Sequence, residues 1–293
     1  MKHDLQISRD QAVLIAGPTA SGKSGLAMKI AERHDRLIVN ADAIQVFENW
    51  RVLTARPSPE DEKAVPHRLY GHIAADGAYS VGHWLRDLKP LLQDPGRLII
   101  VGGTGLYFSA LTEGLAAIPQ IPPETRQEAD DYLRTHGHVA MADQLDPATR
   151  LRIDTLNPAR VQRAWEVLRA TGRGLAAWQD DTPPPLLPPA ECATLLVTAP
   201  KEWLNRRIES RFGKMVASGA LDEARANLPA WDPDRLSSRA IGAPQLVAHL
   251  RGEITLQEAC DAAATATRQF AKRQRNWFRS RMSGWRRIAA DEL

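Results

Sequence analysis

The sequence has few cysteines, no long apolar run and no strong excess of either charge. Cys192 and Cys260 are the only cysteines in 293 residues, too few for a disulfide framework or a zinc site, which favours the reducing cytoplasm. No apolar stretch is long enough to span a bilayer, and the opening MKHDLQISRD lacks the apolar centre of a signal peptide. We therefore expect a globular cytoplasmic protein with no membrane partner and no obligatory protein partner, for which a monomer suffices.

The net charge of +3 is small, but the basic residues are unevenly distributed. From Ala262 to Ala290 the chain has no Asp or Glu. The segment interleaves basic residues with aromatic ones, namely Arg268, Lys272, Arg273, Arg275, Arg279, Arg281, Arg286 and Arg287 with Phe270, Trp277, Phe278 and Trp285. Such a segment suits a polyanion whose bases can stack. It is equally typical of an amphipathic helix whose aromatic residues pack on the core and whose arginines are solvated.

Short apolar runs alternate with helical patterns over much of the chain. The runs at 12–16, 36–43, 96–105 and 193–200 predict strands, and the patterns at 22–34, 80–93 and 104–113 predict helices. This alternation predicts an α/β fold with a parallel sheet flanked by helices. Ligands of such sheets bind at the carboxyl ends of the strands, so we expect residues 17–24, Asp42 and the turn 102–105 around one crevice.

The middle of the chain has helical patterns but no evident strand. Asn157, Pro158 and Gly172 predict the cap, first turn and end of one helix, and an earlier helix is expected to stop at Gly137. We therefore predict a helical insertion domain at 119–189 in a core formed by 1–118 and 190–293. The core should end in a long helix that carries the basic face, 262–287.

The stretch GPTASGKS (17–24) has the pattern of a phosphate-binding loop, G-x-x-x-x-G-K-[ST]. Glycines let successive backbone N–H groups turn toward an anion, and the helix that follows adds the positive end of its dipole. Lys23 supplies a charge for phosphate oxygens, and Ser24 can hold Mg²⁺. The pattern predicts the anion but leaves the reaction open.

The carboxylates are not arranged as in a kinase. A P-loop phosphotransferase usually has an Asp at the end of a later strand to hold its metal. Here the run RLIIV leads into Gly102, Gly103, Thr104 and Gly105. The early carboxylate at a strand end is Asp42, for which three roles are open: metal ligand, general base or helix N-cap.

Seven stretches together resemble the tRNA dimethylallyltransferases, also called tRNA isopentenyltransferases. They are GPTASGKS (17–24), NADAIQVF (40–47), VGGTGLYFSAL (101–111), NPARVQRAWEVLRATG (157–172), RIESRFGKMVASGALDEA (207–224), SRAIGA (238–243) and AKRQRNWFR (271–279). The resemblance, to the bacterial form, implies a P-loop NTPase-like fold. It also implies transfer of a dimethylallyl group from dimethylallyl diphosphate to N6 of adenine 37 in the tRNA anticodon loop. Mg²⁺ would assist, and no ATP would be needed although the loop fits an ATP-binding pattern.

The resemblance implies roles for individual residues. Asp42 would accept the proton from N6, while Lys23, Thr104 and Arg239 would neutralise the leaving diphosphate. The implied diphosphate-binding residues are Gly17, Thr19, Ala20, Ser21, Gly22, Lys23 and Ser24, with Ser24 also the metal ligand. The implied tRNA-binding residues are Asp42, Ala43, Ile44, Gln45, Arg160, Arg163, Lys272, Arg273 and Gln274.

The chain departs from the family pattern at a few positions. Ala43 stands where the family has a serine, Phe47 where it has a tyrosine, and Ala243 where it has an aromatic ring. We expect these departures to affect rate or donor affinity, not reaction type. Two other functions remain open: a small-molecule P-loop kinase, and a tRNA-binding protein without catalysis. Trp277 and Phe278 could belong to the core or stack on bases, and we expect a structural role for His67.

Overall fold

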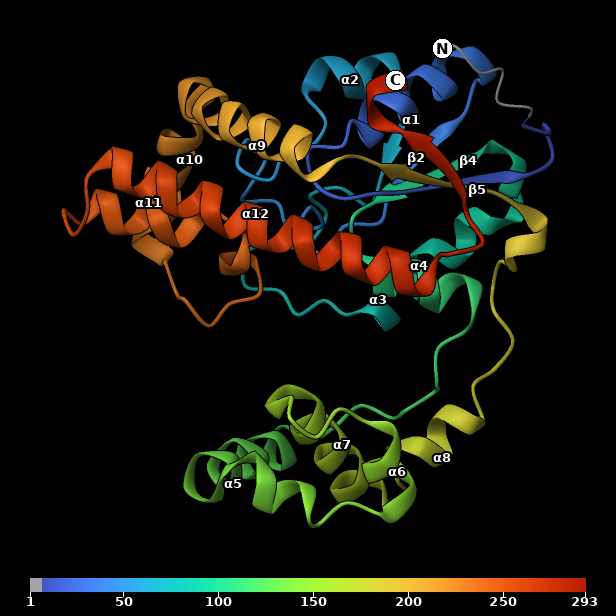
Figure 1. The fold of residues 1–293 in the computed structure, drawn as a ribbon, viewed down its shortest axis with the longest axis vertical. Coiled ribbons are helices and arrows are strands. Elements are labelled where there is room, and N and C mark those ends of the chain that lie inside the picture. The colour runs from blue at the N-terminus through green and yellow to red at the C-terminus, as the bar shows by residue number, and fades with distance from the viewer. Residues whose placement is uncertain (1–6) are drawn as a thin grey trace. The chain divides into compact units, whose positions relative to one another are not determined.

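The core of the protein is a six-stranded parallel sheet, seen here in a computed structural model that describes residues 7–293 (Figure 1). The first six residues of the predicted core lie outside the described part. The strands are β1 (Ala12–Ala16), β2 (Leu37–Asn40), β3 (His67–Arg68), β4 (Leu98–Gly102), β5 (Cys192–Thr198) and β6 (Arg286–Ala289). Their order is β3-β2-β4-β1-β5-β6, and every neighbouring pair is parallel. The predicted α/β fold class is confirmed.

Alternate residues of the strands pack against helices on opposite faces of the sheet. Val13 and Ile15 contact the apolar side of α1 (Lys23–His34), whose buried residues include Leu26 and Ile30. On the other face of the sheet, Leu14 and the neighbouring strand residues pack against α3 (Val81–Leu88), α4 (Gly105–Thr112) and the end of α12 (Leu256–Arg281). Because both faces are covered, β1 and β4 are buried along their whole length, as in other parallel sheets, whereas the edge strands β3 and β6 are largely accessible.

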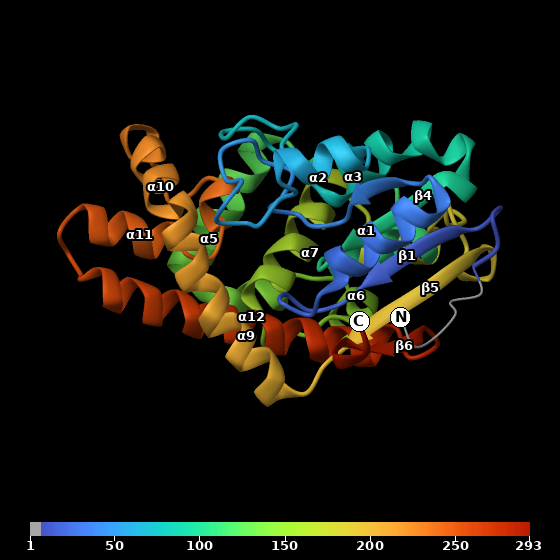
Figure 2. The ribbon, with the colours of Figure 1, turned by 90° about the horizontal axis from the view of Figure 1, so that it is seen from above.

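A helical layer extends the core beyond the sheet (Figure 2). It comprises α9 (Lys201–Met215), α10 (Leu221–Asn227), α11 (Ala243–Leu250) and the first half of α12, packed around Trp50 and Leu53. A short π-helical segment joins α9 to α10 and contains Gly219 at φ 102°. The remaining short helix of the core, α2 (Pro59–Ala64), begins with a capping box in which Ser58 and Asp61 exchange hydrogen bonds.

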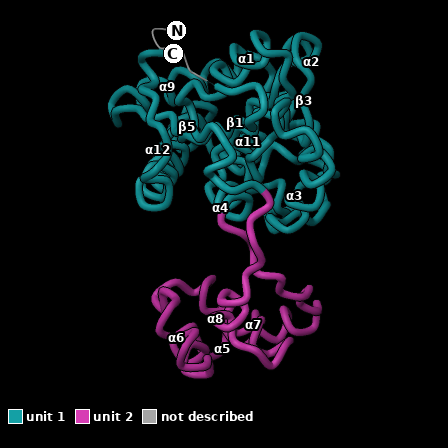
Figure 3. Tube along the Cα trace, turned by 90° about the vertical axis from the view of Figure 1, so that its right-hand side faces the viewer, with its two compact units in different colours: residues 1–112, 187–293 teal, residues 113–186 magenta. Residues whose placement is uncertain are grey.

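The chain divides into two compact units, one of residues 1–112 and 187–293 and one of residues 113–186 (Figure 3). The second unit contains α5 (Pro123–Ala142), α6 (Pro147–Arg152), α7 (Pro158–Thr171) and α8 (Leu175–Asp180). Its own small core includes Met141, Val161 and Trp165, and the Trp165 ring stacks on Tyr132. The boundaries fall a few residues earlier than those expected from the sequence.

Local sequence signals placed most elements correctly. Asn157 caps α7 by accepting a hydrogen bond from the Arg160 N–H, and Gly172 ends the helix in the left-handed conformation. Gly137 breaks α5 as expected, with φ 78° and ψ 168°, but the chain becomes helical again up to Ala142.

Two short edge strands, β3 and β6, were not predicted. The predicted basic helix 262–287 was too long, because α12 ends at Arg281 and Arg286–Ala289 pair with β5. Arg286 and Arg287 therefore belong to a strand. In the described part of the chain, no helix has the length and apolar character needed to cross a membrane.

Candidate active site

The phosphate loop (residues 17–24) connects β1 to α1 and lines a cavity. Gly22 precedes the helix at φ 91°, and no side chain caps the first turn of α1. Ala20 also has a positive φ, 62°. Uncapped N–H groups at a helix start form an anion site. The adjoining cavity of about 630 Å³ (the phosphate cavity) is lined by Thr19, Ala20, Gly22, Lys23 and Ser24 of this loop.

Helix α9 supplies the other side of the phosphate cavity with cations. Arg206, Arg207, Arg211 and Lys214 line it together with Lys23, whereas Asp42 is the one carboxylate that residues 7–293 contribute to the lining. Arg207 Nε donates to the Ala20 carbonyl at 2.9 Å, and Arg211 Nη1 donates to Thr19 Oγ1 at 3.3 Å. Five cations against one carboxylate suit a ligand with several negative charges.

The charge of Lys23 responds to this environment. Burial lowers the pKa of Lys23 from 10.5 to about 8; the Asp42 carboxylate opposes this effect, and the Arg211 guanidinium adds to it. An anion placed beside the ammonium would stabilise the charged form and raise this pKa again. Burial likewise lowers the pKa of Arg211, while Asp42 raises it.

Asp42 lies just beyond the carboxyl end of β2 and is held there by backbone bonds. Its N–H donates to Asn40 Oδ1 at 2.8 Å, and its own Oδ1 accepts the Ile44 N–H at 3.0 Å. The next helix, α2, begins only at Pro59, so the N-cap interpretation of Asp42 is wrong. The carboxylate fixes a short turn and faces the cavity, which leaves the metal-ligand and general-base interpretations.

A second cavity of about 570 Å³ (the apolar cavity) adjoins the phosphate cavity. Thr19, Asp42, Gln45, Thr54 and Arg211 line both. The walls that belong to the second cavity alone are mostly apolar and include Ile44, Leu53, Phe212, Met215, Ile241, Phe270 and Trp277. The site therefore places a carboxylate where a cationic chamber meets an apolar one.

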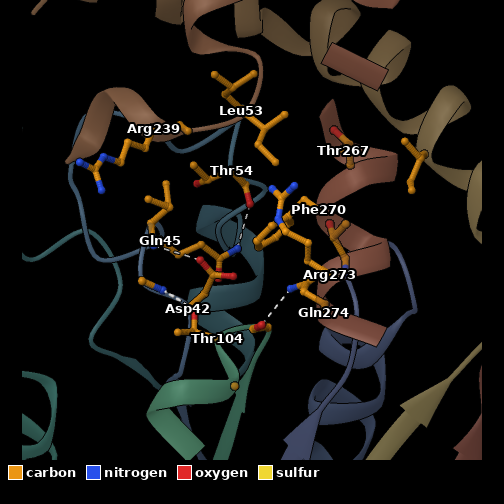
Figure 4. Close-up of a pocket in the computed structure, with 18 of the residues that line it drawn as sticks. Asp42, Gln45, Leu53, Thr54, Thr104, Arg239, Thr267, Phe270, Arg273 and Gln274 are labelled. Carbon is orange, nitrogen blue, oxygen red and sulfur yellow. Dashed lines mark hydrogen bonds between the residues drawn. The ribbon is translucent and has the colours of Figure 1, made fainter. Parts of the chain in front are cut away.

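Thr104 and Gln45 lie beside Asp42 in Figure 4. Thr104 Oγ1 accepts the Ala43 N–H at 2.9 Å, which ties the turn 102–105 to the segment after β2. Gln45 Nε2 donates to the carbonyls of Thr54 and Ala55, at 2.9 and 3.1 Å. The Gln45 amide nitrogen thus holds a neighbouring loop, and reading a base with it would require it to give up these bonds.

Arg239 and Gln274 lie elsewhere than the sequence predicted. Arg239 is exposed and lines only the apolar cavity, and in Figure 4 its guanidinium points away from Asp42. Arg211 occupies the position beside the phosphate loop that was expected for Arg239. Gln274 is only 6% exposed and lines the apolar cavity, so its side chain lies inside the site and not on the outer surface of α12.

The remaining tRNA-binding predictions fall on exposed side chains. Lys272 and Arg273 are exposed on α12, and Arg273 lines the apolar cavity. Arg160 and Arg163 are exposed on α7 of the second unit, where Arg163 pairs with Glu166 at 3.5 Å.

The structure also locates the residues that were ambiguous in the sequence. Phe278 is 2% exposed in the core on one face of the sheet, Trp277 is partly buried against that core, and both line the apolar cavity. His67 lies on β3, and its Nδ1 is 2.8 Å from the Val65 carbonyl. Ala43 lines the apolar cavity, while Phe47 and Ala243 are buried outside its walls.

Arg211 could have been found from the sequence by helical spacing. Arg207, Arg211 and Lys214 recur at intervals of four and three within α9, which puts them on one face of a helix. That pattern predicts a basic face but does not say what the face opposes.

A divalent cation at this site would depend on the ligand. Within residues 7–293 no cluster of three or more His, Cys, Asp or Glu side chains could hold a metal ion. Ser24 and Asp42 both line the phosphate cavity and offer oxygen atoms. Mg²⁺ commonly binds through one or two protein oxygens, phosphate oxygens and water, so this donor set fits Mg²⁺ that arrives with a phosphate ester.

The fold and the site define a P-loop protein in which a cationic cavity adjoins an apolar one. The family model "IPP transferase" matches residues 45–281, and the model "Isopentenyl transferase" matches residues 10–75. The chain is 60% identical over 284 residues to the tRNA dimethylallyltransferase of Ruegeria sp. (strain TM1040), covering 97% of each chain. It is 62% identical over 282 residues to that of Dinoroseobacter shibae, covering 95% of each. The chain therefore belongs to the tRNA dimethylallyltransferase family, which confirms the resemblance seen in the sequence.

Solved structures agree with this assignment. The full-length tRNA isopentenylpyrophosphate transferase of Bacillus halodurans superposes with a TM-score of 0.68 at 29% identity, covering 96% of this chain and 90% of that one. A eukaryotic dimethylallyltransferase captured acting on tRNA shares the fold, with a TM-score of 0.80 over 95% of this chain and 73% of that one, at 21% identity.

Proposed function

We propose that this protein transfers the dimethylallyl group of dimethylallyl diphosphate to N6 of adenine 37 in tRNA and releases diphosphate. The observation that carries the proposal is the junction at Asp42, where a cavity lined by five cations meets an apolar cavity. A donor with a diphosphate head and a short branched hydrocarbon tail matches both halves.

The donor's diphosphate would lie in the phosphate cavity, against the N–H groups at the start of α1, Lys23 and Arg211. The allylic carbon would then face Asp42 and Thr104 from the apolar side. N6 attacks this carbon, the bond from carbon to the diphosphate oxygen breaks, and the electron pair leaves with the diphosphate. Lys23 and Arg211 stabilise the charge that develops there. Asp42 accepts the proton from N6.

Mg²⁺ held by Ser24 and the diphosphate would add positive charge at the leaving group. This leaves the Asp42 carboxylate free for the proton, although it lines the same cavity.

The acceptor adenine would leave the stack of the anticodon loop to enter the apolar cavity. Lys272 and Arg273 lie on the exposed side of α12, and Arg273 lines this cavity, so they are placed to attract the backbone phosphates near it. Arg160 and Arg163 offer the same chemistry on the second unit. A cytoplasmic location follows from the substrate.

The test uses purified protein, Mg²⁺, radiolabelled dimethylallyl diphosphate and unmodified tRNA carrying adenine 37, without ATP. We expect label in the tRNA, and its loss when adenine 37 is replaced by guanine or when Asp42→Ala is used. Hydrolysis of ATP with no label in the tRNA would support the kinase interpretation instead. Binding of tRNA with neither reaction would support a binding protein without catalysis.

A further inference from the structure

Gln274 joins three parts of the site that are far apart in the sequence. Its Oε1 accepts the Thr19 N–H of the phosphate loop at 2.9 Å, and its Nε2 donates to the Gly103 carbonyl at 2.9 Å. The side chain itself belongs to α12 and is 6% exposed. Figure 4 shows it reaching from α12 toward the strand ends, below Arg273.

The same helix makes a second close contact with the turn 102–105. A Cβ on Gly105 would come within 2.2 Å of the Trp277 ring, and a Cβ on Gly103 would come within 2.3 Å of Gln274 Nε2. The two glycines therefore permit α12 to lie directly on the turn. Thr104 lies between them and accepts the Ala43 N–H, so the position of the turn also sets the segment that carries Asp42.

Thr19 is restrained from two directions. Its N–H is bound by Gln274 of α12, and its Oγ1 accepts from Arg211 of α9. The Thr19 N–H is thus taken up by Gln274, whereas the N–H groups at the start of α1 have no side-chain cap and are left for a phosphate. Gln274 thus fixes where the phosphate loop stands relative to the turn on the acceptor side.

We infer that Gln274 is a positioning residue, which holds the phosphate loop and the turn 102–105 at the separation that the prenyl transfer requires. This inference rests on the proposed function. It assigns Gln274, which also lines the apolar cavity, the task of joining the donor-side loop to the acceptor-side turn instead of a contact with tRNA. Displacement of reacting groups by about 1 Å can cost roughly 100-fold in rate. The Gln274 side chain by itself bridges the phosphate loop and the turn that position those groups.

The experiment compares Gln274→Met with Gln274→Glu. Met has a similar length and fills the space but removes both hydrogen bonds. Glu keeps an acceptor for the Thr19 N–H but faces the Gly103 carbonyl with a carboxylate oxygen in place of a donor. The matched control is Gln257→Met, because Gln257 is an exposed glutamine on the same helix that bonds only to Asp261, at 3.1 Å. Lys272→Met serves as the comparison for a tRNA contact.

Kinetics with radiolabelled dimethylallyl diphosphate would give kcat and separate KM values for donor and tRNA. We expect Gln274→Met to lower kcat by roughly 10- to 100-fold with the KM for tRNA unchanged. Gln274→Glu should lower kcat at least as much, and Gln257→Met should match the wild type. Lys272→Met should raise the KM for tRNA with kcat retained.

Three outcomes would overturn the inference. A raised KM for tRNA with an unchanged kcat in Gln274→Met would make the residue a tRNA contact. Wild-type values of both constants would leave it without a role in the reaction. In the third outcome, Gln274→Met has a lower melting temperature, but its activity equals that of the wild type once it is divided by the fraction of molecules that bind inorganic diphosphate. The role of Gln274 would then be structural only. If the wild type and Gln257→Met transfer no label, the proposed function itself fails, and that result is distinct from the other three.

Discussion

Binding of diphosphate should draw a proton onto Lys23 in mildly alkaline solution. In the free protein the Lys23 pKa is about 8 because of burial, and a bound anion should raise it. At pH 8 about half of the free molecules lack this proton, so binding should take up about half a proton per site. At pH 9 only about one free molecule in ten retains it, so affinity should be about tenfold lower than at pH 7.

Calorimetric titration with inorganic diphosphate and Mg²⁺, in two buffers of different ionisation enthalpy at pH 7, 8 and 9, measures this proton uptake. Diphosphate itself titrates in this range, so the control is Lys23→Arg, whose side chain stays protonated throughout. The difference between the two proteins is the contribution of Lys23. Equal proton uptake by both proteins at pH 8 would refute the reasoning.

The same shift predicts how stability depends on pH. The unfolded chain keeps the Lys23 proton up to a pH near 10.5 and the folded chain only to about 8. The unfolded state therefore binds more protons between these values, and stability rises with pH across that window. Below pH 8 the cost of the buried charge is fully present. Each pKa unit is worth about 1.4 kcal/mol, but Lys23 is only half-buried, so we expect a cost of about 1–2 kcal/mol.

Lys23→Met should accordingly stabilise the ligand-free protein at pH 7 while it weakens diphosphate binding. Denaturant titrations at pH 7 and pH 10.5 measure the change. The gain should be present at the lower pH and largely absent at the higher one. A variant that is less stable than the wild type at pH 7 would contradict the assigned cost of burial.

Three further predictions concern single positions. Asp42→Asn keeps an acceptor for the turn but cannot take a proton, so single-turnover label transfer should slow by about 10²- to 10⁴-fold while diphosphate binding persists; an unchanged rate would remove Asp42 as the base. Arg211→Met should raise the donor KM by at least about tenfold, because a hydrogen bond to a charged group contributes about 1.5–3 kcal/mol. Arg239→Met should leave the donor KM unchanged. The reverse pattern would support the sequence-based prediction that Arg239 binds the diphosphate. Gly102→Ala should lower the melting temperature sharply, because its Cβ would lie 2.0 Å from a backbone carbonyl, while Gly284→Ala has nothing within 4 Å and should not.

Local sequence determined the elements whose conformation depends on neighbouring residues. The spacing of the glycines in GPTASGKS predicts the turn and the uncapped helix start, because φ values such as the 91° of Gly22 favour glycine. Asn157 and Gly172 predict both ends of α7 for similar reasons. Apolar runs of strand length, separated by helical patterns, were enough to predict a parallel sheet and hence the edge where Asp42 and Thr104 meet.

The tertiary structure alone decided which long side chains reach that edge. Helical spacing puts Arg211 on a basic face of α9 but does not say what that face meets. The packing of α9 across from the phosphate loop brings in Arg211 and leaves Arg239 exposed. Gln274 looked like one polar residue in a basic helix, but the rotation of α12 about its axis turns it inward, 2.9 Å from Thr19. Such contacts join residues more than 150 positions apart, and only the packing of the whole core fixes which side of each helix faces the site.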